Sequence, residues 1–316
     1  KLKQIRAKSI NKNFLHSKEY LNAKLSFNNQ TIYADVRLDG LFNDHWSLRK
    51  QWSLKFKIKG NKAIKGYTNF TLSKHYTRQH PSNQIISSIN SHHGVLSPIS
   101  ETFRVKINGE WWGNMLLEED MSESFLELNK RKVNPIFRFE DIYTQLSLRK
   151  KIKRLFNNDN FDLYHEIDLF SKQYFSHLTF NKKKKYTYDT NYHNIISKVK
   201  SIFLKIEDNE IKNYEVDNLL DVEKFSISLL NVLIFGTSGH GLQYQNIRFY
   251  YNTFTNKLEP IPRDHFYIRD LQIKSLINNE EISNFQDTIN NLPNIYLKVI
   301  KSIKFAKIYD DYLSNF

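Results

Sequence analysis

The pair Asn108-Gly109, set between two runs of alternating apolar and polar residues, constrains the fold of this chain more than any other feature. The flanking runs are residues 101–107 (ETFRVKI) and 111–117 (WWGNMLL). Asn and Gly accept the left-handed backbone conformations that a two-residue turn requires, so the pattern predicts a β-hairpin. We therefore expect the first part of the chain to contain antiparallel strands.

The rest of this first part repeats the pattern. Further alternating runs predict strands at residues 31–38, 51–58 and 65–72, and residues 133–139 form another candidate. Two short helices are expected among the strands, from Pro81 to about residue 90 and from Ser122 to residue 130. Pro suits a first helical turn and Ser is a common helix cap. Strands with separate helices indicate an α+β layer arrangement.

The later part of the chain is predicted to be mostly helical. Apolar residues recur at helical spacing in residues 192–206 and 216–235, and the tail at 271–316 has the same character with a break near Pro293. Between the two helical regions and the tail, residues 246–251 and 257–261 predict a second hairpin. Basic runs at 149–154 and 182–185 mark an insertion. We expect a β-rich lobe at 1–139, an insertion at 140–190 and a helical lobe at 191–316.

The composition excludes several classes of protein. The chain has 40% hydrophobic and 14% aromatic residues, enough to form a core, and it has no Cys, which excludes a disulfide scaffold, a zinc-thiolate site and a cysteine nucleophile. Its longest apolar stretch is too short to span a bilayer, so we do not expect an integral membrane protein. The net charge of +14 attracts anions, although a composition rich in Lys and Asn also fits an A+T-rich coding sequence.

The start of the chain bears on its location. The first residue is Lys1 rather than Met, so we expect that a signal or anchor has been removed upstream. A secreted or cell-envelope location is the expectation that follows.

The most informative polar stretch is residues 236–264. A loop rich in small residues leaves an apolar helix, presents His240, Gln243 and Asn246, and enters the second hairpin, whose far strand leads to Asp264. A hairpin returns its two ends to one place, so Asn246 and Asp264 are expected to converge. One Asp and one Asn supply the oxygen ligands that hold Mg²⁺ in many phosphoryl-transfer sites. The alternative is a loop that satisfies its own backbone, with Asp264 as a helix cap.

A second candidate cluster lies among the predicted strands. Lys55, Glu119 and Arg138 fall on three of them, and a cation paired with a Glu across a sheet is how protein kinases bind nucleotide phosphates. The alternative is a set of ordinary solvated charges. The four Trp residues also fall in this part, where core packing is the simplest expectation and stacking on adenine is the functional one: Trp46, Trp52, Trp111 and Trp112.

Several blocks of this sequence, in order, resemble the CotH kinase family of spore-coat-type atypical protein kinases. The blocks span about residues 33–270: VRLDG at 36–40, KQWSLKF at 50–56, VKINGEWWG at 105–113 with LLEE at 116–119, PIFR at 135–138, NIRFYY at 246–251 and LEPIPRD at 258–264. The resemblance implies a two-lobed, protein-kinase-like fold and transfer of phosphate from ATP, with Mg²⁺, to Ser or Thr of a protein.

The resemblance also implies roles for the candidate residues. Asp264 and Asn246 would bind Mg²⁺, Lys55 and Arg138 would bind the nucleotide phosphates, and Glu119 would orient one of these two cations. The catalytic Asp of the family should precede Asn246, but the only acidic residue from Phe225 to Arg263 is Glu259, in the following strand. His240 and Gln243 occupy the expected place and become the catalytic candidates.

Two alternatives remain open at this point. A pseudokinase, or a module that binds acidic or phosphorylated ligands, fits the missing acid and the +14 charge. A phosphotransferase that acts on a glycan or another small molecule would need the same metal ligands. Nucleic-acid binding is not expected, because the basic runs are not interleaved with aromatic residues.

Overall fold

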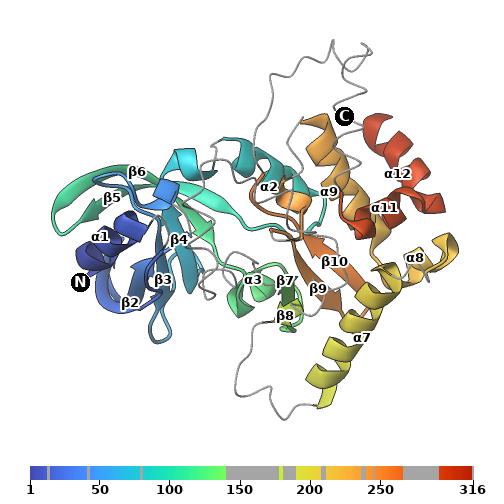
Figure 1. Ribbon diagram of the computed structural model, residues 1–316, viewed down its shortest axis with the longest axis horizontal. Coiled ribbons are helices and arrows are strands. Elements are labelled where there is room, and N and C mark those ends of the chain that lie inside the picture. Colours follow the sequence, from blue (N-terminus) through green and yellow to red (C-terminus); the bar gives the residue numbers. More distant parts are fainter. Residues whose placement is uncertain are drawn as a thin grey trace. The chain divides into compact units, whose positions relative to one another are not determined.

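The computed structural model has an α+β fold, as predicted, with a curled antiparallel sheet in the N-terminal part and helices in the C-terminal part (Figure 1). The structure describes residues 1–12, 15–40, 43–78, 81–139, 178–180, 190–207, 211–235, 240–244, 246–265 and 292–314. The chain divides into two compact units. Unit 1 comprises Lys1–Ser88 and Pro98–Val133, and unit 2 comprises Ile89–Ser97 and Asn134–Phe316.

Unit 1 is built on a six-stranded antiparallel sheet of order β1-β2-β3-β4-β6-β5. Its strands are β1 (Leu21–Phe27), β2 (Gln30–Leu38), β3 (Leu54–Ile58), β4 (Asn69–Ser73), β5 (Ser100–Ile107) and β6 (Glu110–Glu119). Phe27 and Phe103, from the two outermost strands, have ring centroids 6.0 Å apart, which shows how far the sheet curls. The core of unit 1 fills the inside of this curl.

The two faces of the sheet carry different sets of residues. Leu54, Phe56 and Phe70 belong to a buried cluster with Trp46 and Trp52. The alternate residues of each strand point to the opposite side of the sheet, which we call the outer face. One row of paired residues crosses the outer face from β2 to β5: Arg37, Lys55, Thr71, Glu118 and Ser100.

Helices complete unit 1. Helix α1 (Leu2–Lys12) packs Ile5 into the same core, and Arg6 donates to the carbonyls of Trp46, Ser47 and Leu48. Two 3₁₀ turns, η1 (Asn43–His45) and η2 (His75–Arg78), follow β2 and β4. Helix α2 (Ser82–His92) begins in unit 1 and ends in unit 2, and α3 (Glu123–Leu128) follows β6.

The predicted hairpin is confirmed, and so are the other strands of unit 1, although β3 starts at Leu54 instead of residue 51 and β4 also starts later than predicted. Asn108 and Gly109 have φ angles of 52° and 79°, as a two-residue turn requires. Strand β4 starts at Asn69 instead of residue 65, because Lys65 and Gly66 form a turn with φ angles of 52° and 88°. Helix α1 and strand β1 were not predicted.

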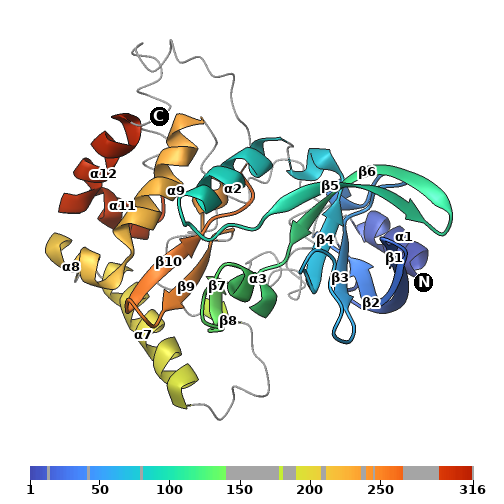
Figure 2. The ribbon, with the colours of Figure 1, turned by 180° about the vertical axis from the view of Figure 1, so that it is seen from behind.

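Unit 2 contains a four-stranded sheet of order β10-β9-β7-β8 (Figure 2). Its strands are β7 (Ile136–Phe139), β8 (Leu178–Phe180), β9 (Arg248–Asn252) and β10 (Lys257–Ile261), and η5 (His240–Leu242) precedes β9. The helices are α7 (Thr190–Glu207), α8 (Asn213–Leu219), α9 (Val222–Ile234), α11 (Asn294–Ile300) and α12 (Ile303–Ser314). An aromatic-rich core joins helices and sheet, with Phe203 and Phe249 at a centroid distance of 4.9 Å.

The helical prediction for this unit holds with one correction. The single helix expected at 216–235 is two helices, because Leu220 adopts an extended conformation and Asp221 starts α9 as its cap, accepting from the backbone N–H of Lys224. The predicted insertion at 140–190 and the tail at 271–291 lie almost wholly outside the described residues; β8 and the first residue of α7 are the described parts of that insertion.

Within the described ranges, no helix is long and apolar enough to cross a membrane.

Candidate functional site

The candidate residues are distributed over both units. Lys55 and Glu119 belong to unit 1, whereas Arg138, His240, Gln243, Asn246 and Asp264 belong to unit 2. Each set is described below within its own unit.

The β9–β10 hairpin brings Asn246 and Asp264 to the same end. Arg248 at the start of β9 pairs with Ile261 at the end of β10. Asn246 lies two residues before this pair and Asp264 lies three residues after it, so both residues lie at the open end of the hairpin. The register therefore places both residues near this end of the hairpin, and the convergence of their side chains stays a prediction.

A second contact joins the η5 loop to the segment that carries Asp264. A Cβ atom added at Gly241 would lie 2.4 Å from the carbonyl oxygen of Arg263 and 2.8 Å from Nδ1 of His265. Such a distance to a backbone atom is shorter than packed side chains tolerate. Gly241 is thus the residue that lets the two segments touch on either side of Asp264.

Asp264 itself adopts an unusual backbone conformation. Its φ angle is 57°, in the left-handed region, where Asp and Asn occur more often than other residues with a Cβ atom. Its side chain is 13% exposed, and its Oδ2 lies 3.5 Å from Nε of Arg263. The preceding Pro262 offers its carbonyl to the buried hydroxyl of Ser97, at 3.5 Å. A residue held in this conformation by packed neighbours fits a functional carboxylate better than a chance loop position.

The turn before β9 positions Asn246. Its backbone N–H donates to the carbonyl of Gln243 at 2.9 Å, and the guanidinium of Arg248 donates to the carbonyl of Asn246 at 2.9 Å. Gln243 and Asn246 are both half-buried. The side chain of His240 lies outside the described residues, although its backbone begins η5.

The donor set at this end of the hairpin suits a hard cation that also binds phosphate. Among the described residues there is no group of three His, Asp or Glu that could hold a metal ion. Asp264 and Asn246 offer one carboxylate and one carboxamide. Mg²⁺ typically takes one or two carboxylates from the protein and completes its octahedron with water and phosphate oxygens. The residues present therefore fit Mg²⁺ bound together with a phosphorylated ligand.

Lys55 is paired in unit 1, but with a different acid from the one expected. Its Nζ lies 2.7 Å from Oδ2 of Asp120, and the two side chains are 19% and 29% exposed. The register explains the choice, because Lys55 and Glu118 lie in one row on the outer face, and Asp120, two residues on, points to the same face. Glu119 lies between these two acids along the chain and points to the other face.

Glu119 is a buried residue of the inner face of the sheet. It is only 3% exposed, it pairs across the sheet with Phe70, and no hydrogen-bond partner for its Oε1 occurs in the described part of the chain. Burial, and secondarily the charge of Asp120, raises the pKa of Glu119 to about 8. The same carboxyl contributes, after burial, to raising the pKa of Tyr67 to about 12. Glu119 was expected to orient either Lys55 or Arg138, and the carboxylate that contacts Lys55 is that of Asp120.

Arg138 occupies the exposed position of strand β7 in unit 2. Its neighbours Phe137 and Phe139 are buried, and it pairs across the sheet with Thr179 of β8. Of the two phosphate-binding candidates, Lys55 is half-buried and bound to Asp120, whereas Arg138 is exposed.

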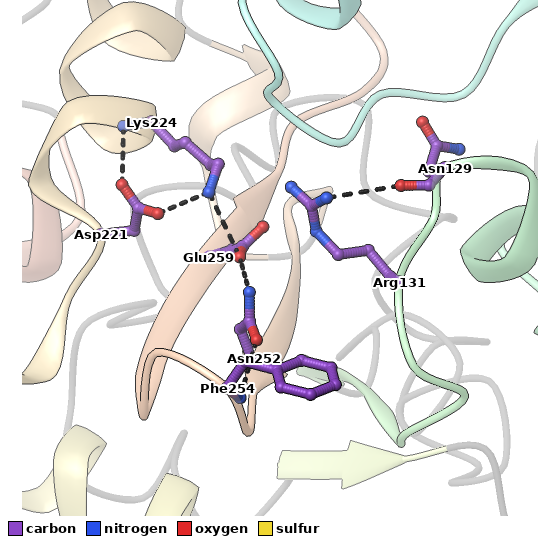
Figure 3. Close-up of polar contacts among 7 residues, drawn as sticks. All are labelled: Asn129, Arg131, Asp221, Lys224, Asn252, Phe254 and Glu259. Carbon is purple, nitrogen blue, oxygen red and sulfur yellow. Dashed lines mark hydrogen bonds and ion pairs between the residues drawn. The ribbon is translucent and has the colours of Figure 1, made fainter.

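A buried charge cluster in unit 2 was not anticipated from the sequence (Figure 3). Glu259 is fully buried on β10, and its Oε1 accepts from Asn252 at 2.7 Å and lies 3.2 Å from Nζ of Lys224. Lys224 also binds Asp221, the cap of α9, at 2.5 Å. These contacts tie the hairpin to α9. The sequence does contain a signal for this cluster. Glu259 stands among the apolar residues Leu258, Pro260 and Ile261, and an acid in an apolar run is expected to be buried and to need a partner.

Comparison with known proteins adds no assignment. No protein-family model matches the sequence, and no curated protein matches it either.

Proposed function

We propose that this chain binds Mg²⁺ and ATP and transfers phosphate, with Asn246 and Asp264 of unit 2 as the protein ligands of the metal. The observation that supports the proposal is that Asn246 and Asp264 both flank the open end of the β9–β10 hairpin, where Gly241 packs directly against the residues on either side of Asp264. The kinase-like arrangement of two lobes and the resemblance to CotH kinases belong to this proposal.

Charge neutralisation is the chemistry that such a site supplies. Phosphoryl transfer needs positioning and cationic stabilisation of the phosphate oxygens more than covalent participation of the protein, and a bound Mg²⁺ supplies two positive charges. Lys55, held by Asp120, is the cation that we assign to the nucleotide phosphates in unit 1. The acceptor hydroxyl would be oriented by Gln243 or His240 of the η5 loop. Ser or Thr of a protein is the acceptor that the sequence resemblance suggests.

The decisive variant is Asp264→Asn. Asn has almost the same shape and also tolerates the left-handed conformation at this position, so the fold should be retained while the negative charge is lost. We expect the affinity for ATP in the presence of Mg²⁺, measured by isothermal titration calorimetry, to fall at least about tenfold, because the metal loses its only charged protein ligand.

The matched control is Asp310→Asn, which removes the same charge from an exposed position of α12. Its affinity for Mg·ATP should equal that of the wild type. Unchanged Mg·ATP affinity in the folded Asp264→Asn variant would remove the metal site from the proposal.

One observation favours a second candidate, a nucleotide-binding protein that does not transfer phosphate. Glu259, the only acid between Phe225 and Arg263, is fully buried and engaged with Lys224 and Asn252, so it cannot act as the general base. A single experiment separates the two candidates. Mg·ATP binding accompanied by transfer of labelled phosphate from ATP to a Ser-rich protein supports the enzyme. Binding at the same affinity without this transfer supports the nucleotide-binding protein.

A further inference from the structure

One aromatic side chain is conspicuous on the outer face of unit 1. Trp111, at the start of β6, is 48% exposed, whereas the other three Trp side chains are buried. The cause is a β-bulge: Val105 pairs with Gly113 but the next residue, Lys106, pairs with Trp111, so β6 contains one extra residue. The extra residue, Trp112, turns into the core, and Trp111 remains outside.

Two lysines flank Trp111. The turn at Asn108 and Gly109 makes the first flanking pair hydrogen-bonded, so the next pair, Lys106 with Trp111, is a non-hydrogen-bonded pair with its side chains close together. The carbonyl of Trp111 then points away from β5, and Nζ of Lys50 donates to it at 3.1 Å. Across the β5–β6 hairpin, the order is therefore Lys106, Trp111 and then Lys50.

The patch is positively charged and open. Arg104 lies two residues before Lys106 on the same face, and both are exposed. Within the described ranges neither has an acidic partner, and the one nearby acid is Glu110, 3.7 Å from Nζ of Lys50 and 62% exposed. This end of β6 extends beyond β4, which pairs only with residues 116–119 (Figure 1). Three cations and one acid thus surround a single exposed indole ring.

We propose that Lys50, Arg104, Lys106 and Trp111, here called the ribbon patch, bind an acidic polysaccharide. The face of an indole ring stacks on the apolar face of a sugar, and Lys and Arg bind carboxylate or phosphate groups through charge-assisted hydrogen bonds.

The arrangement of the patch favours this ligand over other polyanions. A line of cation, ring and cation fits a polymer in which rings and charges follow one axis. A single-stranded nucleic acid places its phosphates beside a row of bases and uses several aromatic platforms, whereas the ribbon patch has one. An acidic peptide would leave the indole face without a ring to stack on. The ribbon patch shares no residue with the nucleotide site proposed above, which consists of Asn246 and Asp264 of unit 2 and Lys55 of unit 1.

The test uses the whole chain without nucleotide. Polygalacturonate is the probe, binding is measured by microscale thermophoresis at low and physiological salt, and dextran, oligo-dT and poly-glutamate are the comparison ligands. We expect polygalacturonate to bind, more weakly as salt rises because exposed charges are screened, and dextran not to bind. Trp111→Ala should weaken binding at least about fivefold, and Lys106→Glu about tenfold or more.

Two matched variants control for non-specific effects. Phe254→Ala removes an aromatic side chain that is 82% exposed in unit 2, and Lys200→Glu reverses an exposed charge on α7. Both should bind polygalacturonate as the wild type does. The proposal is overturned if polygalacturonate does not bind, if Trp111→Ala binds it as well as the wild type, if Lys200→Glu weakens binding as much as Lys106→Glu, or if oligo-dT or poly-glutamate binds more tightly through the same residues.

Discussion

Replacing Glu119 by Gln should stabilise unit 1 at neutral pH and remove part of its pH dependence. The carboxyl group is 3% exposed and its pKa in the folded chain is about 8, against 4.5 for a free Glu side chain. The folded state therefore holds the proton more tightly than the unfolded state, and unfolding between these two pH values releases it. Raising the pH through this window favours the unfolded state.

The size of the effect follows from the window. Stability from this group is fully present below pH 4.5 and is lost as the pH rises to about 8. At pH 7 the loss corresponds to 2.5 pH units, or about 3 kcal/mol at about 1.4 kcal/mol per unit. Gln resembles the protonated carboxyl in shape and cannot ionise. Glu119→Gln should therefore match the wild type near pH 4.5 and exceed its free energy of unfolding by about 3 kcal/mol at pH 7.

The chain offers a selective assay for this prediction. All four Trp residues lie in unit 1, so urea unfolding followed by Trp fluorescence reports on that unit. The matched control is Glu127→Gln, at an exposed position of α3. Its unfolding curve should shift from that of the wild type by the same amount at pH 4.5 and pH 7, or not at all. The reasoning fails if the free energies of unfolding of the wild type and Glu119→Gln differ by the same amount at pH 4.5 and at pH 7. The carboxyl would then not be held neutral by burial.

Two further predictions concern unit 2. Lys224→Met should lower the free energy of unfolding by about 3 kcal/mol, measured by circular dichroism in urea, because fully buried Glu259 loses its cation; a loss no greater than that of the exposed control Lys200→Met would contradict this. Gly241→Ala should cost about 2 kcal/mol and also weaken Mg·ATP binding, because the new methyl group displaces the segment around Asp264; wild-type Mg·ATP affinity in that variant would show that the contact does not position the carboxylate.

The sequence determined the strands of unit 1 better than it determined which side chains meet. Glu119 was expected to pair with Lys55 or Arg138, but the acid that contacts Lys55 is the next residue, Asp120, and the reason is visible in β6. Met115, Leu116 and Leu117 are all buried, so this strand is apolar on both faces and its pattern does not reveal which face is the core. Register with β4 supplies that information, and it places Glu119 opposite Phe70.

Other features were readable but were not used. Asn28 and Asn29, with φ angles of 47° and 60°, form the turn between β1 and β2, and a pair of Asn residues between alternating runs is a hairpin signal of the same kind as Asn108-Gly109. Asp221 is a common type of helix cap and divides the apolar run at 216–235. Contacts such as that of Gly241 with Arg263 depend on tertiary packing and leave no pattern in the sequence.

The open end of the β9–β10 hairpin combines two features that do not favour stability. Asp264 adopts a backbone conformation that costs about 1 kcal/mol or more, and Gly241 gives up a side chain so that backbone segments can touch. Neither feature is needed to close a hairpin, because β9 and β10 already pair over five residues. What both features do accomplish is to fix the place and direction of one carboxylate group. The proposed Mg²⁺ site would require such an arrangement, because the proposal assigns the charged protein ligand of the metal to Asp264, whether phosphate is then transferred or only held.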